Sequence, residues 1–587
     1  MENKKTKIIS IASIIALALT LVTATFAYFM AQTGEGKSTD IKINANTVDT
    51  FTFEAGSALN LSLNQENFAS GKGNQTGTTF AKAMLTANNK TNTATEHYYL
   101  YLNISNNTFT YSIDNNTPEI LLSIKDGSNN EITTLTGLTY KTVTDGKGAS
   151  IKGFDITKKS GLITILNNRE ITTTSTKIEQ WNVTVTFVNY NSNQAGNAGK
   201  SFAAKLMVQK EKITLLADWV ISQYTGTQGD NALYYHNSTL TNGAGDNSYR
   251  YAGGDYVLTD AGKATGATMI IGYDKYISTA LIDFYCNGTK QFVGYRCSSS
   301  QTHYYLIKGD TTQYQTYNEA LNASVEKGYL TKDNVKNFVC FGTDASPCPT
   351  ENLYRIIGVF NNQVKLIKYD YAKSSLLGTD GDFSQEYSYY FSGEQGESPS
   401  SNSMYYWNNA GTNTWSESNL NKVNLNTNFV NNIGTAWAKK IATTTWKVGG
   451  GSWSNIVTSV PKIAYQYEVG SSASSTTVDK KIGLMYVTDY YYSASPSAWT
   501  LVGYNESDAT KDYRFSKGEN WLYGGGWDWT ISRISDNSNH AFSVGNFGRV
   551  YGSDVGSNSG ARPSFSLLSS TTYVSGSGSM SDPVRIN

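Results

Sequence analysis

The sequence predicts a mainly β protein, and three observations lead to this prediction. First, Gly (52 residues) and Tyr (41) are abundant while only 16% of residues are charged, and this composition favours strands and turns over helices. Second, several apolar stretches alternate with polar residues at a period of two, the pattern of half-buried strands. Third, polar turn clusters such as Asp126–Asn130 separate these stretches. The expected architecture is an N-terminal antiparallel β-sandwich followed by an α+β module with an insertion.

Length and charge narrow the functional classes. The 587 residues allow three or four domains of about 150 residues each, or fewer larger ones. Lys+Arg and Asp+Glu both number 47, so no positive excess steers the chain to nucleic acid or to an acidic membrane. Aromatic residues, at 13%, are sufficient to build a core, so most of the chain is expected to fold. Nucleic acid is therefore not an expected partner.

Residues 1–30 have the pattern of an export segment. Lys4, Lys5 and Lys7 precede an uncharged run at residues 8–30. Small residues before Ala27 allow cleavage after it, whereas the length of the run also fits an uncleaved membrane anchor, so both alternatives remain open. The stretch "ATFAYFMAQ" resembles the export segment of camelysin-type and biofilm-matrix fibre proteins of Gram-positive bacteria. We therefore expect the chain outside the cell or on the surface of a bacterium.

Residues 38–211 are predicted to form the β-sandwich. Trp181, Val183, Val185 and Phe187 alternate with polar residues, so one face of this strand is buried and the other is wet. Four more strands are expected at residues 98–104, 109–113, 120–124 and 202–208. The region has no cysteine and only one histidine, and we interpret it as a spacer or a matrix-fibre subunit without a catalytic set.

Residues 213–570 form the second predicted region, and residues 254–336 are interpreted as an insertion within it. A helix at 217–224 opens the region. A turn and edge strand at 245–254 have their natural continuation at 337–344. The insertion holds a helix at 317–327, with Thr316 and Glu319 at the spacing of a capping box and Gly328 after its end. Residues 571–587 are predicted to be a flexible tail.

All four cysteines lie in this second region, and an even number in an exported chain favours disulfides. Three connectivities are open. We favour Cys286–Cys297 and Cys340–Cys348, because each closes a short loop. Four free thiols are the alternative.

The last third of the chain carries recognisable segments. Residues 353–360 and 363–371 predict a hairpin around Asn361-Asn362. A helix is expected at 415–429, with Ser418 as its N-cap and Leu420, Val423 and Phe429 facing the core. Residues 480–492 resemble the strand that follows such a helix in a C-type-lectin-like fold, and this resemblance implies a strand there. Trp527, Trp529 and Ile531 alternate with polar residues in another strand, and further strands follow at 542–544, 549–551 and 564–568.

These segments resemble a C-type-lectin-like fold, in the branch found in bacterial surface proteins and related to formylglycine-generating enzymes. The resemblance covers about residues 350–567 and rests on "WSESNLNKVNLNTNF", "KKIGLMYVTDYYY" and the closing "GARPSFSL". It implies a surface module that presents a face to a ligand. The enzymatic members use cysteines late in the chain, and this chain has none beyond Cys348. The "EPN", "QPD" and "WND" signatures of calcium-dependent sugar binding are also missing, so neither activity is carried over.

The sequence predicts no enzyme. It contains no HExxH, GxSxG, Walker or Rossmann pattern, and its four histidines are isolated. No cofactor is expected. A calcium site at Asp380, Asp382, Ser384 and Glu386 is an alternative to a solvated turn, although the segment lacks the glycine and distal Glu of a calcium loop.

We expect an exported adhesion protein that binds a glycan or protein through an aromatic and polar face. Trp527 and Trp529 are expected in the core. The candidate binding residues are Tyr523, Trp521, Tyr405, Tyr406 and Trp407, which lie in loops rich in Gly, Ser and Asn. The alternative is a structural extracellular matrix or fibre component. The ligand and the oligomeric state are not predicted.

Overall fold

The structure is mainly β, as the composition predicts. The computed structural model describes residues 49–63, 67, 71–88, 92–267, 281–291, 297, 298, 300–332, 334–389, 400–545 and 547–587. The chain forms two compact units, which we call unit 1 (Met1–Ile213) and unit 2 (Thr214–Asn587). The expected export segment, residues 1–30, lies outside the described residues. No helix in the described part of the chain is long and apolar enough to cross a membrane.

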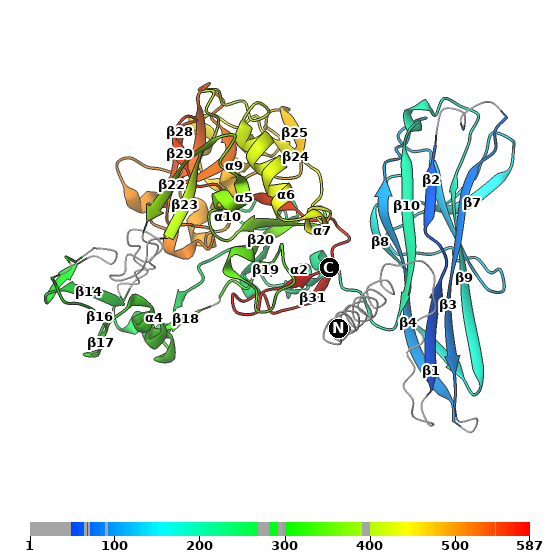
Figure 1. Cartoon of the computed structure of the whole chain (residues 1–587), viewed down its shortest axis with the longest axis horizontal. Helices are drawn as coiled ribbons and strands as arrows, with labels where there is room; N and C mark the ends of the chain where they lie inside the picture. Colours follow the sequence, from blue (N-terminus) through cyan, green and yellow to red (C-terminus); the bar gives the residue numbers. More distant parts are fainter. Residues whose placement is uncertain are drawn as a thin grey trace, which may run out of the picture. The chain divides into compact units, whose positions relative to one another are not determined.

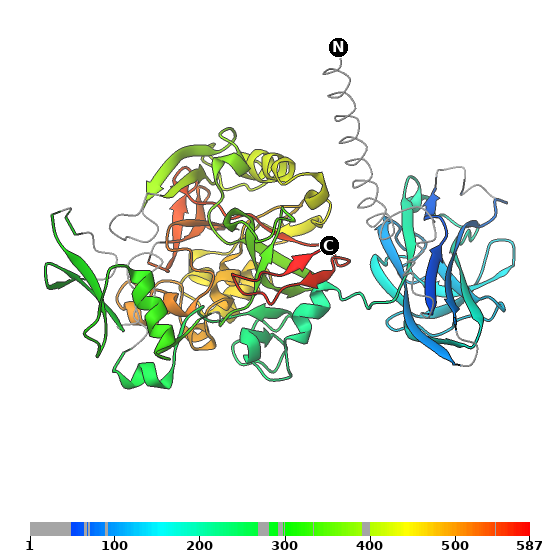
Figure 2. The same ribbon diagram turned by 60° about the horizontal axis from the view of Figure 1, so that its bottom comes forward.

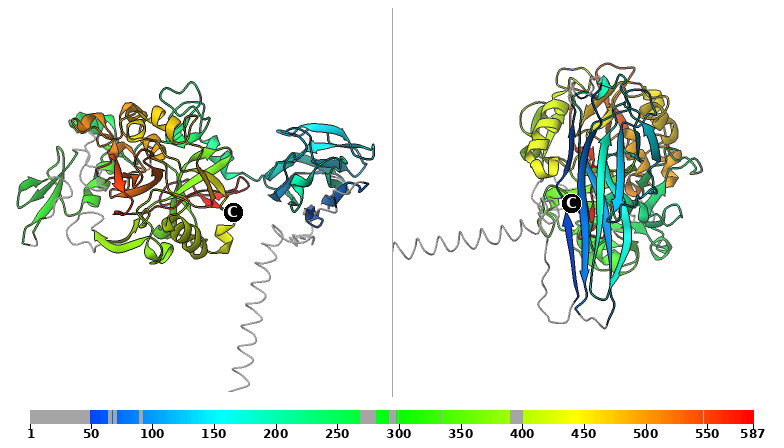
Figure 3. Two further views of the ribbon diagram at one scale, coloured as in Figure 1. Left: turned by 90° about the horizontal axis from the view of Figure 1, so that it is seen from above. Right: turned by 90° about the vertical axis from the view of Figure 1, so that its right-hand side faces the viewer.

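Unit 1 is the predicted antiparallel β-sandwich, and its long strands are visible in Figures 1 and 3. One sheet has the order β1-β3-β9-β5-β7-β6 and the other has the order β2-β10-β4-β8. The strands are β1 Thr50–Ala55, β2 Leu59–Ser62, β3 Gln75–Thr86, β4 Ala94–Asn107, β5 Ile120–Asp126, β6 Tyr140–Thr144, β7 Ser150–Asp155, β8 Gly161–Thr173, β9 Thr176–Phe187 and β10 Ser201–Gln209.

The core of unit 1 follows the predicted alternation. Trp181, Val183 and Val185 are buried on β9, while Asn182 between them is exposed. The buried side chains pack against apolar residues of the other sheet, such as Leu102 on β4. The period of two therefore identified the correct face of this strand.

The strand predicted at residues 109–113 is wrong, because these residues form a loop. Its backbone amides bond to side chains instead of to a neighbouring strand. The Thr110 amide donates to Asn197 Oδ1 (3.0 Å), and the Ser112 amide donates to the buried Glu119 carboxylate (2.5 Å). Polar side chains from distant segments thus replace a sheet ladder, which a local pattern does not reveal.

Unit 2 is built on a mixed set of short strands and helices around one large core. Its main sheet has the order β11-β12-β20-β21-β30, and β19 also pairs with β20. The strands are β11 Leu233–Tyr235, β12 Tyr249–Tyr251, β19 Phe338–Cys340, β20 Leu353–Phe360, β21 Gln363–Lys368 and β30 Ser564–Ser566. Helix α2 (Leu216–Ser222) opens the unit, close to the predicted position. The β20–β21 hairpin turns at Asn361 and Asn362, which both have positive φ, as expected.

β12 and β19 lie end to end along β20. Arg250 in β12 pairs with Gly358, and Val339 in β19 pairs with Tyr354, both antiparallel. Residues 337–344 therefore continue the line of the earlier strand, as the sequence suggested. β12 is nevertheless not an edge strand, because β11 covers its outer side.

The residues between β12 and β19 form a lobe with a core of its own, drawn in green in Figures 1 and 2. It contains the sheet β15-β14-β16-β17 and helix α4 (Tyr317–Glu326), which begins with the predicted Thr316–Glu319 capping box. The strands of this sheet are β14 Ile282–Cys286, β15 Thr289–Gln291, β16 His303–Ile307 and β17 Gln313–Tyr314. A two-stranded ribbon of β13 (Val257–Leu258) and β18 (Leu330–Thr331) joins the lobe to the rest of unit 2.

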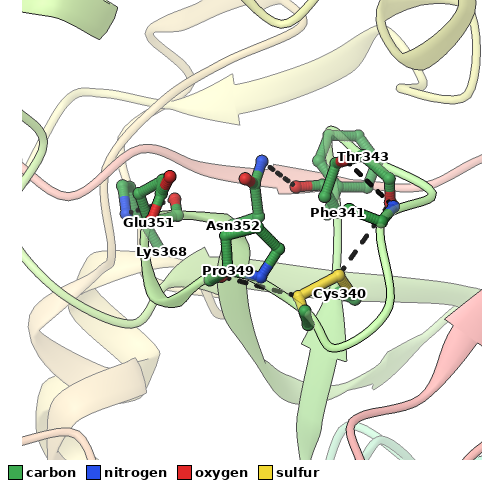
Figure 4. The surroundings of a disulfide bond; sticks show 9 residues. Cys340, Phe341, Thr343, Pro349, Glu351, Asn352 and Lys368 are labelled. Carbon is green, nitrogen blue, oxygen red and sulfur yellow. Dashed lines mark hydrogen bonds between the residues drawn. A yellow bond between two sulfur atoms is a disulfide. The ribbon is translucent and has the colours of Figure 1, made fainter.

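Both favoured disulfides are present. Cys286–Cys297 closes a loop in the lobe, and Cys340–Cys348 closes the loop after β19, with Cα–Cα distances of 5.7 and 5.9 Å. Figure 4 shows the second bond and, beside it, the hydrogen bond from Asn352 Nδ2 to the Phe341 carbonyl (3.0 Å). The disulfide thus fixes the chain between β19 and β20.

The predicted helix at 415–429 is shorter and wider than expected. Residues Leu420–Phe429 wind as a π helix, followed by α6 (Val430–Asn432). Leu420, Leu425 and Phe429 are buried, but Val423 is only half-buried, because the wider turns bring residues five apart onto one face. Ser418 still accepts a hydrogen bond from the Asn421 amide (3.2 Å), as an N-cap would.

The strand predicted at 480–492 is mostly wrong. Only its first residue belongs to a strand, β25 (Thr477–Lys480), and Val487–Tyr492 form helix α10. The buried Glu468 carboxylate accepts hydrogen bonds from the Val487 and Thr488 amides (2.8 and 2.9 Å), so it satisfies the first turn of the helix. This cap comes from a helix 20 residues earlier in the chain.

The predicted flexible tail is instead ordered. β31 (Tyr573–Ser575) and β32 (Arg585–Ile586) form a hairpin, and Val584 is fully buried. The Cys340 amide donates to the Val584 carbonyl (3.0 Å). The glycines and serines of this segment form the turn of a hairpin that closes on β19.

Candidate functional site

Three of the five predicted binding residues belong to the core. Tyr405 and Trp407 have no exposed surface, and Trp521 is 6% exposed. Their polar atoms are satisfied inside: the Tyr405 hydroxyl donates to the Gly378 carbonyl (2.9 Å), Trp407 Nε1 to the Thr530 carbonyl (2.9 Å) and Trp521 Nε1 to the Tyr251 carbonyl (2.9 Å). These three side chains are structural, and only Tyr406 and Tyr523 are half-buried.

The glycine run Gly524-Gly525-Gly526 does not form an open loop. Tyr371 is buried against it, and its hydroxyl accepts a hydrogen bond from the Gly526 amide (3.1 Å). A Cβ on Gly524 would lie 2.8 Å from the Tyr371 hydroxyl oxygen, and one on Gly560 would overlap the ring. Glycine is required here so that two backbone segments can enclose one tyrosine ring.

The closing "GARP" turn holds an internal ion pair. Arg562 Nε donates to the Asp528 carboxylate (2.6 Å), and Nη2 donates to the Leu522 carbonyl (2.7 Å). Burial would lower the pKa of Arg562, but the Asp528 carboxylate raises it above its usual value, so the guanidinium stays charged. Asp528, between Trp527 and Trp529, is buried as well as Trp529. β26 (Asp528–Arg533) is therefore buried on both faces and is not the half-exposed strand that was expected.

Trp527 is the exception in this strand region, because it is only half-buried while Trp529 is fully buried. Both were expected in the core. Trp527 belongs to a surface group that we call the Arg549 cluster. Its members share partial exposure and mutual ring contacts, and they are Trp453, Tyr504, Trp527, Arg549 and Tyr551.

Arg549 and Tyr551 are two residues apart at the start of β28 (Val550–Asp554), so their side chains share a face, whereas Val550 between them is buried. The guanidinium carbon of Arg549 lies 4.8 Å from the ring centroids of both Tyr551 and Tyr504. β28 is labelled near the top of unit 2 in Figure 1. Two tyrosines therefore hold one guanidinium by cation–π contact.

Two glycines in the neighbouring backbone, Gly503 and Gly545, allow this assembly because they carry no side chain. The Val550 amide donates to the Gly503 carbonyl (3.0 Å), which brings Tyr504 alongside β28. A Cβ on Gly545 would lie 3.3 Å from the Trp527 ring, so the bare backbone of Gly545 lets that ring cross the end of β27 (His540–Val544). Trp527 then meets Tyr551 edge to face, with centroids 6.1 Å apart.

Trp453 completes the group from the start of α8 (Trp453–Ile456). Its ring centroid lies 6.0 Å from that of Tyr551, at an interplanar angle of 86°. The Ser452 side chain caps the helix by accepting a hydrogen bond from the Asn455 amide (3.2 Å). This cap fixes where the helix begins and therefore where Trp453 lies. A helix, a loop, the residue before β26 and strand β28 thus contribute to one face.

The polar side-chain atoms of the Arg549 cluster have no hydrogen-bond partner among the residues that the structure describes. Within the described residues, the Arg549 guanidinium makes no ion pair or hydrogen bond, and its Nε is buried. The hydroxyls of Tyr504 and Tyr551 and the indole nitrogens of Trp453 and Trp527 likewise have no hydrogen-bond partner among those residues. The buried Trp407, Trp446, Trp499, Trp521 and Trp529 differ, because each indole nitrogen donates to a carbonyl.

Arg514 shows the contrast within the same surface. Its guanidinium lies 4.9 Å from the Tyr504 ring, but it is paired with the buried Asp512 carboxylate (2.6 Å). That pair is neutral overall. The uncompensated positive charge on this face therefore comes from Arg549.

Tyr523, one of the predicted residues, lies close to the cluster. Lys517 Nζ is 6.0 Å from the Tyr523 ring, and Lys517 Cβ packs against Gly548, directly before Arg549 in the chain. Tyr523 therefore lies near the Arg549 cluster, whereas the sequence analysis did not single out Arg549, Tyr551, Tyr504 or Trp453 as binding residues. The one available signal was the spacing of Arg549 and Tyr551 on a predicted strand.

The acidic segment weighed as a calcium site has structural roles. Asp382 is buried and accepts hydrogen bonds from the Leu420 and Asn409 amides (2.7 and 3.0 Å), and Asp380 accepts from Asn428 Nδ2 (2.6 Å). Glu386 accepts a hydrogen bond from Ser403 (2.9 Å). In the described part of the chain, no group of three or more His, Cys, Asp or Glu residues could hold a metal ion.

The most buried histidine is also structural. His236 accepts a hydrogen bond from the Ala244 amide at Nδ1 (3.1 Å) and lies against the Tyr492 and Trp499 rings. Burial and the positive charge of Arg250 hold its pKa well below the usual value, so the ring is neutral.

The chain matches no family model and no curated protein.

Proposed function

We propose that the chain is an exported binding protein of the bacterial surface, and that unit 2 binds an extracellular ligand through the Arg549 cluster. Unit 1 serves as a β-sandwich spacer, and the chain is not an enzyme. The single observation that carries the proposal is the Arg549 guanidinium, which has no ion-pair partner among the described residues. It lies among half-buried tyrosines and tryptophans whose polar atoms have no hydrogen-bond partner among those residues either.

The composition of the face supports this proposal. Trp, Tyr and Arg are the residues that contribute most to binding energy at interfaces. Tyr and Trp offer large rigid contact areas at little entropic cost, and their flat faces suit stacking on sugar rings or on apolar protein groups. A cluster held in place by Gly503, Gly545 and α8 is preorganised, which lowers the cost of binding.

Two further features support the export and the fold within the proposal. Disulfides persist in oxidising compartments, and both cysteine pairs of this chain are bonded. The segment that resembles the end of a C-type-lectin-like domain, "GARPSFSL", closes the main sheet as β30 beside β21. The C-type-lectin-like assignment remains part of this proposal.

The test is a glycan and glycoprotein array probed with the exported full-length chain. We expect a bound ligand, and we expect Trp527→Ala to weaken that binding at least tenfold. The matched control is Tyr304→Ala, which removes a half-buried ring stacked on Tyr285 in the lobe and should bind as the wild type does. Absence of any ligand, together with concentration-dependent assembly in light scattering, would instead favour the matrix or fibre function.

A further inference from the structure

Resting on the proposed binding function, we infer that the ligand is an acidic glycan. Its carboxylate binds the Arg549 guanidinium, and the sugar ring that carries the carboxylate lies on the neighbouring tyrosine and tryptophan rings. The inference names a ligand class, carboxylate-bearing sugars, which includes hexuronic acids and sialic acids.

The first step of the argument is the charge of Arg549. Four other arginines of unit 2 are each paired with a carboxylate, namely Arg250 with Asp246, Arg355 with Asp255, Arg514 with Asp512 and Arg562 with Asp528. Arg549 has lost part of its hydration, since its Nε is buried, and has gained no carboxylate among the described residues. A partly desolvated cation without a counter-charge is unfavourable unless an external anion completes it.

The second step is geometry. The guanidinium is a planar fork that matches both oxygens of a carboxylate. The tyrosine rings contact Arg549 through cation–π interactions, and these leave its N–H groups without acceptors among the described residues. The contacts fix the orientation of the fork before the ligand arrives. A carboxylate can therefore bind without displacing a protein partner.

The third step is the placement of the nearby carboxylates. Asp536 accepts a hydrogen bond from the Trp453 amide (3.3 Å). Asp512 is neutralised by Arg514, and Asp508 lies 3.2 Å from Lys511. Among the described residues, no carboxylate lies within ion-pair distance of Arg549. The Arg549 guanidinium is consequently available to an external anion.

The fourth step separates a sugar from an acidic peptide. The cluster offers hydroxyl groups and indole N–H groups beside ring faces, and sugar hydroxyls and C–H faces match both kinds of surface. β28, which carries Tyr551, is an edge strand of the β26-β27-β28 sheet, and its Val550 amide donates to the Gly503 carbonyl (3.0 Å). The five side chains that form the face come from four separate segments. At Val550 the Gly503 segment therefore occupies the edge along which a peptide strand would add.

The experiment measures binding of short oligogalacturonates to the full-length chain by calorimetry. The matched ligand is the methyl ester, which keeps the ring and removes the charge. Sialyllactose against lactose tests the other acidic sugar, and an oligoglutamate tests an acidic peptide. We expect at least one free acid to bind at least tenfold more tightly than its neutral counterpart, a difference of about 1.4 kcal/mol.

The protein variants are Arg549→Gln and Arg549→Lys. Arg549→Gln should remove the preference for the acid, and Arg549→Lys should restore part of it, since the charge returns without the fork. The control is Arg585→Gln, which removes the same charge from another half-buried arginine that also lacks an ion pair among the described residues, and it should bind as the wild type does.

Equal binding of acid and neutral forms, or unchanged binding by Arg549→Gln, would overturn the inference. If an array ligand is lost on Trp527→Ala but is neutral, the proposed binding function stands and the acidic-glycan inference fails. Oligoglutamate binding as tight as that of the best acidic sugar would also overturn it, because charge alone would then explain the affinity. If no array ligand and no acid bind, both proposals fail.

Discussion

Removing Arg562 should strongly destabilise unit 2. In Arg562→Met, the Asp528 carboxylate, which is 1% exposed, keeps its charge but loses the guanidinium that bonds to it at 2.6 Å. The Leu522 carbonyl also loses its hydrogen bond from Nη2. Methionine fills much of the volume of the arginine stem, so the cost is mainly electrostatic.

The magnitude follows from these contacts. Breaking a buried ion pair from one side costs about 3–5 kcal/mol, and the orphaned carbonyl adds about 1 kcal/mol. We therefore expect Arg562→Met to lower the free energy of unfolding by about 4–6 kcal/mol. The double variant Arg562→Met with Asp528→Asn should recover a large part of this loss, because no unpaired charge remains.

Urea unfolding of the full chain followed by tryptophan fluorescence measures the effect. Of the 11 tryptophans, all except Trp181 lie in unit 2, so the signal reports on that unit. The control Arg585→Met should stay within about 0.5 kcal/mol. A loss below about 1 kcal/mol for Arg562→Met would refute the assignment of the closing turn as an internal anchor.

Three more outcomes are expected. Tyr405→Ala should lower the free energy of unfolding by about 3–5 kcal/mol, since it empties a fully buried site; a near-normal melting temperature would return Tyr405 to the surface. Burial alone would raise the pKa of Asp246, but Arg250 and Ser248 hold it well below its usual value. This stabilisation is therefore present at neutral pH and is lost as the pH falls below about 4, so Asp246→Asn should flatten the acid limb of the stability curve; an unchanged limb would contradict it. Replacing both Cys340 and Cys348 by Ser should cost about 2–3 kcal/mol in a loop-entropy treatment, and peptide mapping of the wild type should recover this pair; finding Cys297–Cys340 instead would contradict the pairing.

Features set by neighbouring residues were predictable from the sequence. The alternation around Val183, the Asn361-Asn362 turn and the Thr316–Glu319 capping box all depend on residues a few positions apart. The two disulfides belong to the same class, because each closes a short loop. In each case the controlling interaction lies within the stretch that was inspected.

Features set by distant partners were not predictable. α10 forms where a strand was expected because Glu468 satisfies its first amides. Tyr405 and Trp407 are buried against β26, more than a hundred residues away, where the Thr530 carbonyl accepts a hydrogen bond from Trp407 Nε1 and Trp529 Nε1 donates one to the Tyr405 carbonyl. Polar neighbours such as Ser and Asn suggested exposed loops, but here Asn, Ser and Thr also line the interior. The Arg549 cluster was not predicted for the same reason, since its residues come from four separate segments of the chain.

The two-stranded neck of the lobe has a consequence for how this protein can change over evolution. The chain enters the lobe after Asp255 and returns at Asn334, whose amide donates to the Asp255 carbonyl (3.1 Å). Because the two ends of the lobe, Asp255 and Asn334, are hydrogen-bonded to each other, a short linker between them can replace the whole lobe. Strands β12 and β19 would then keep their places along β20. Lobes of other sizes and sequences can therefore be exchanged at this point as cassettes, while the sheet that carries the Cys340–Cys348 bond keeps its register.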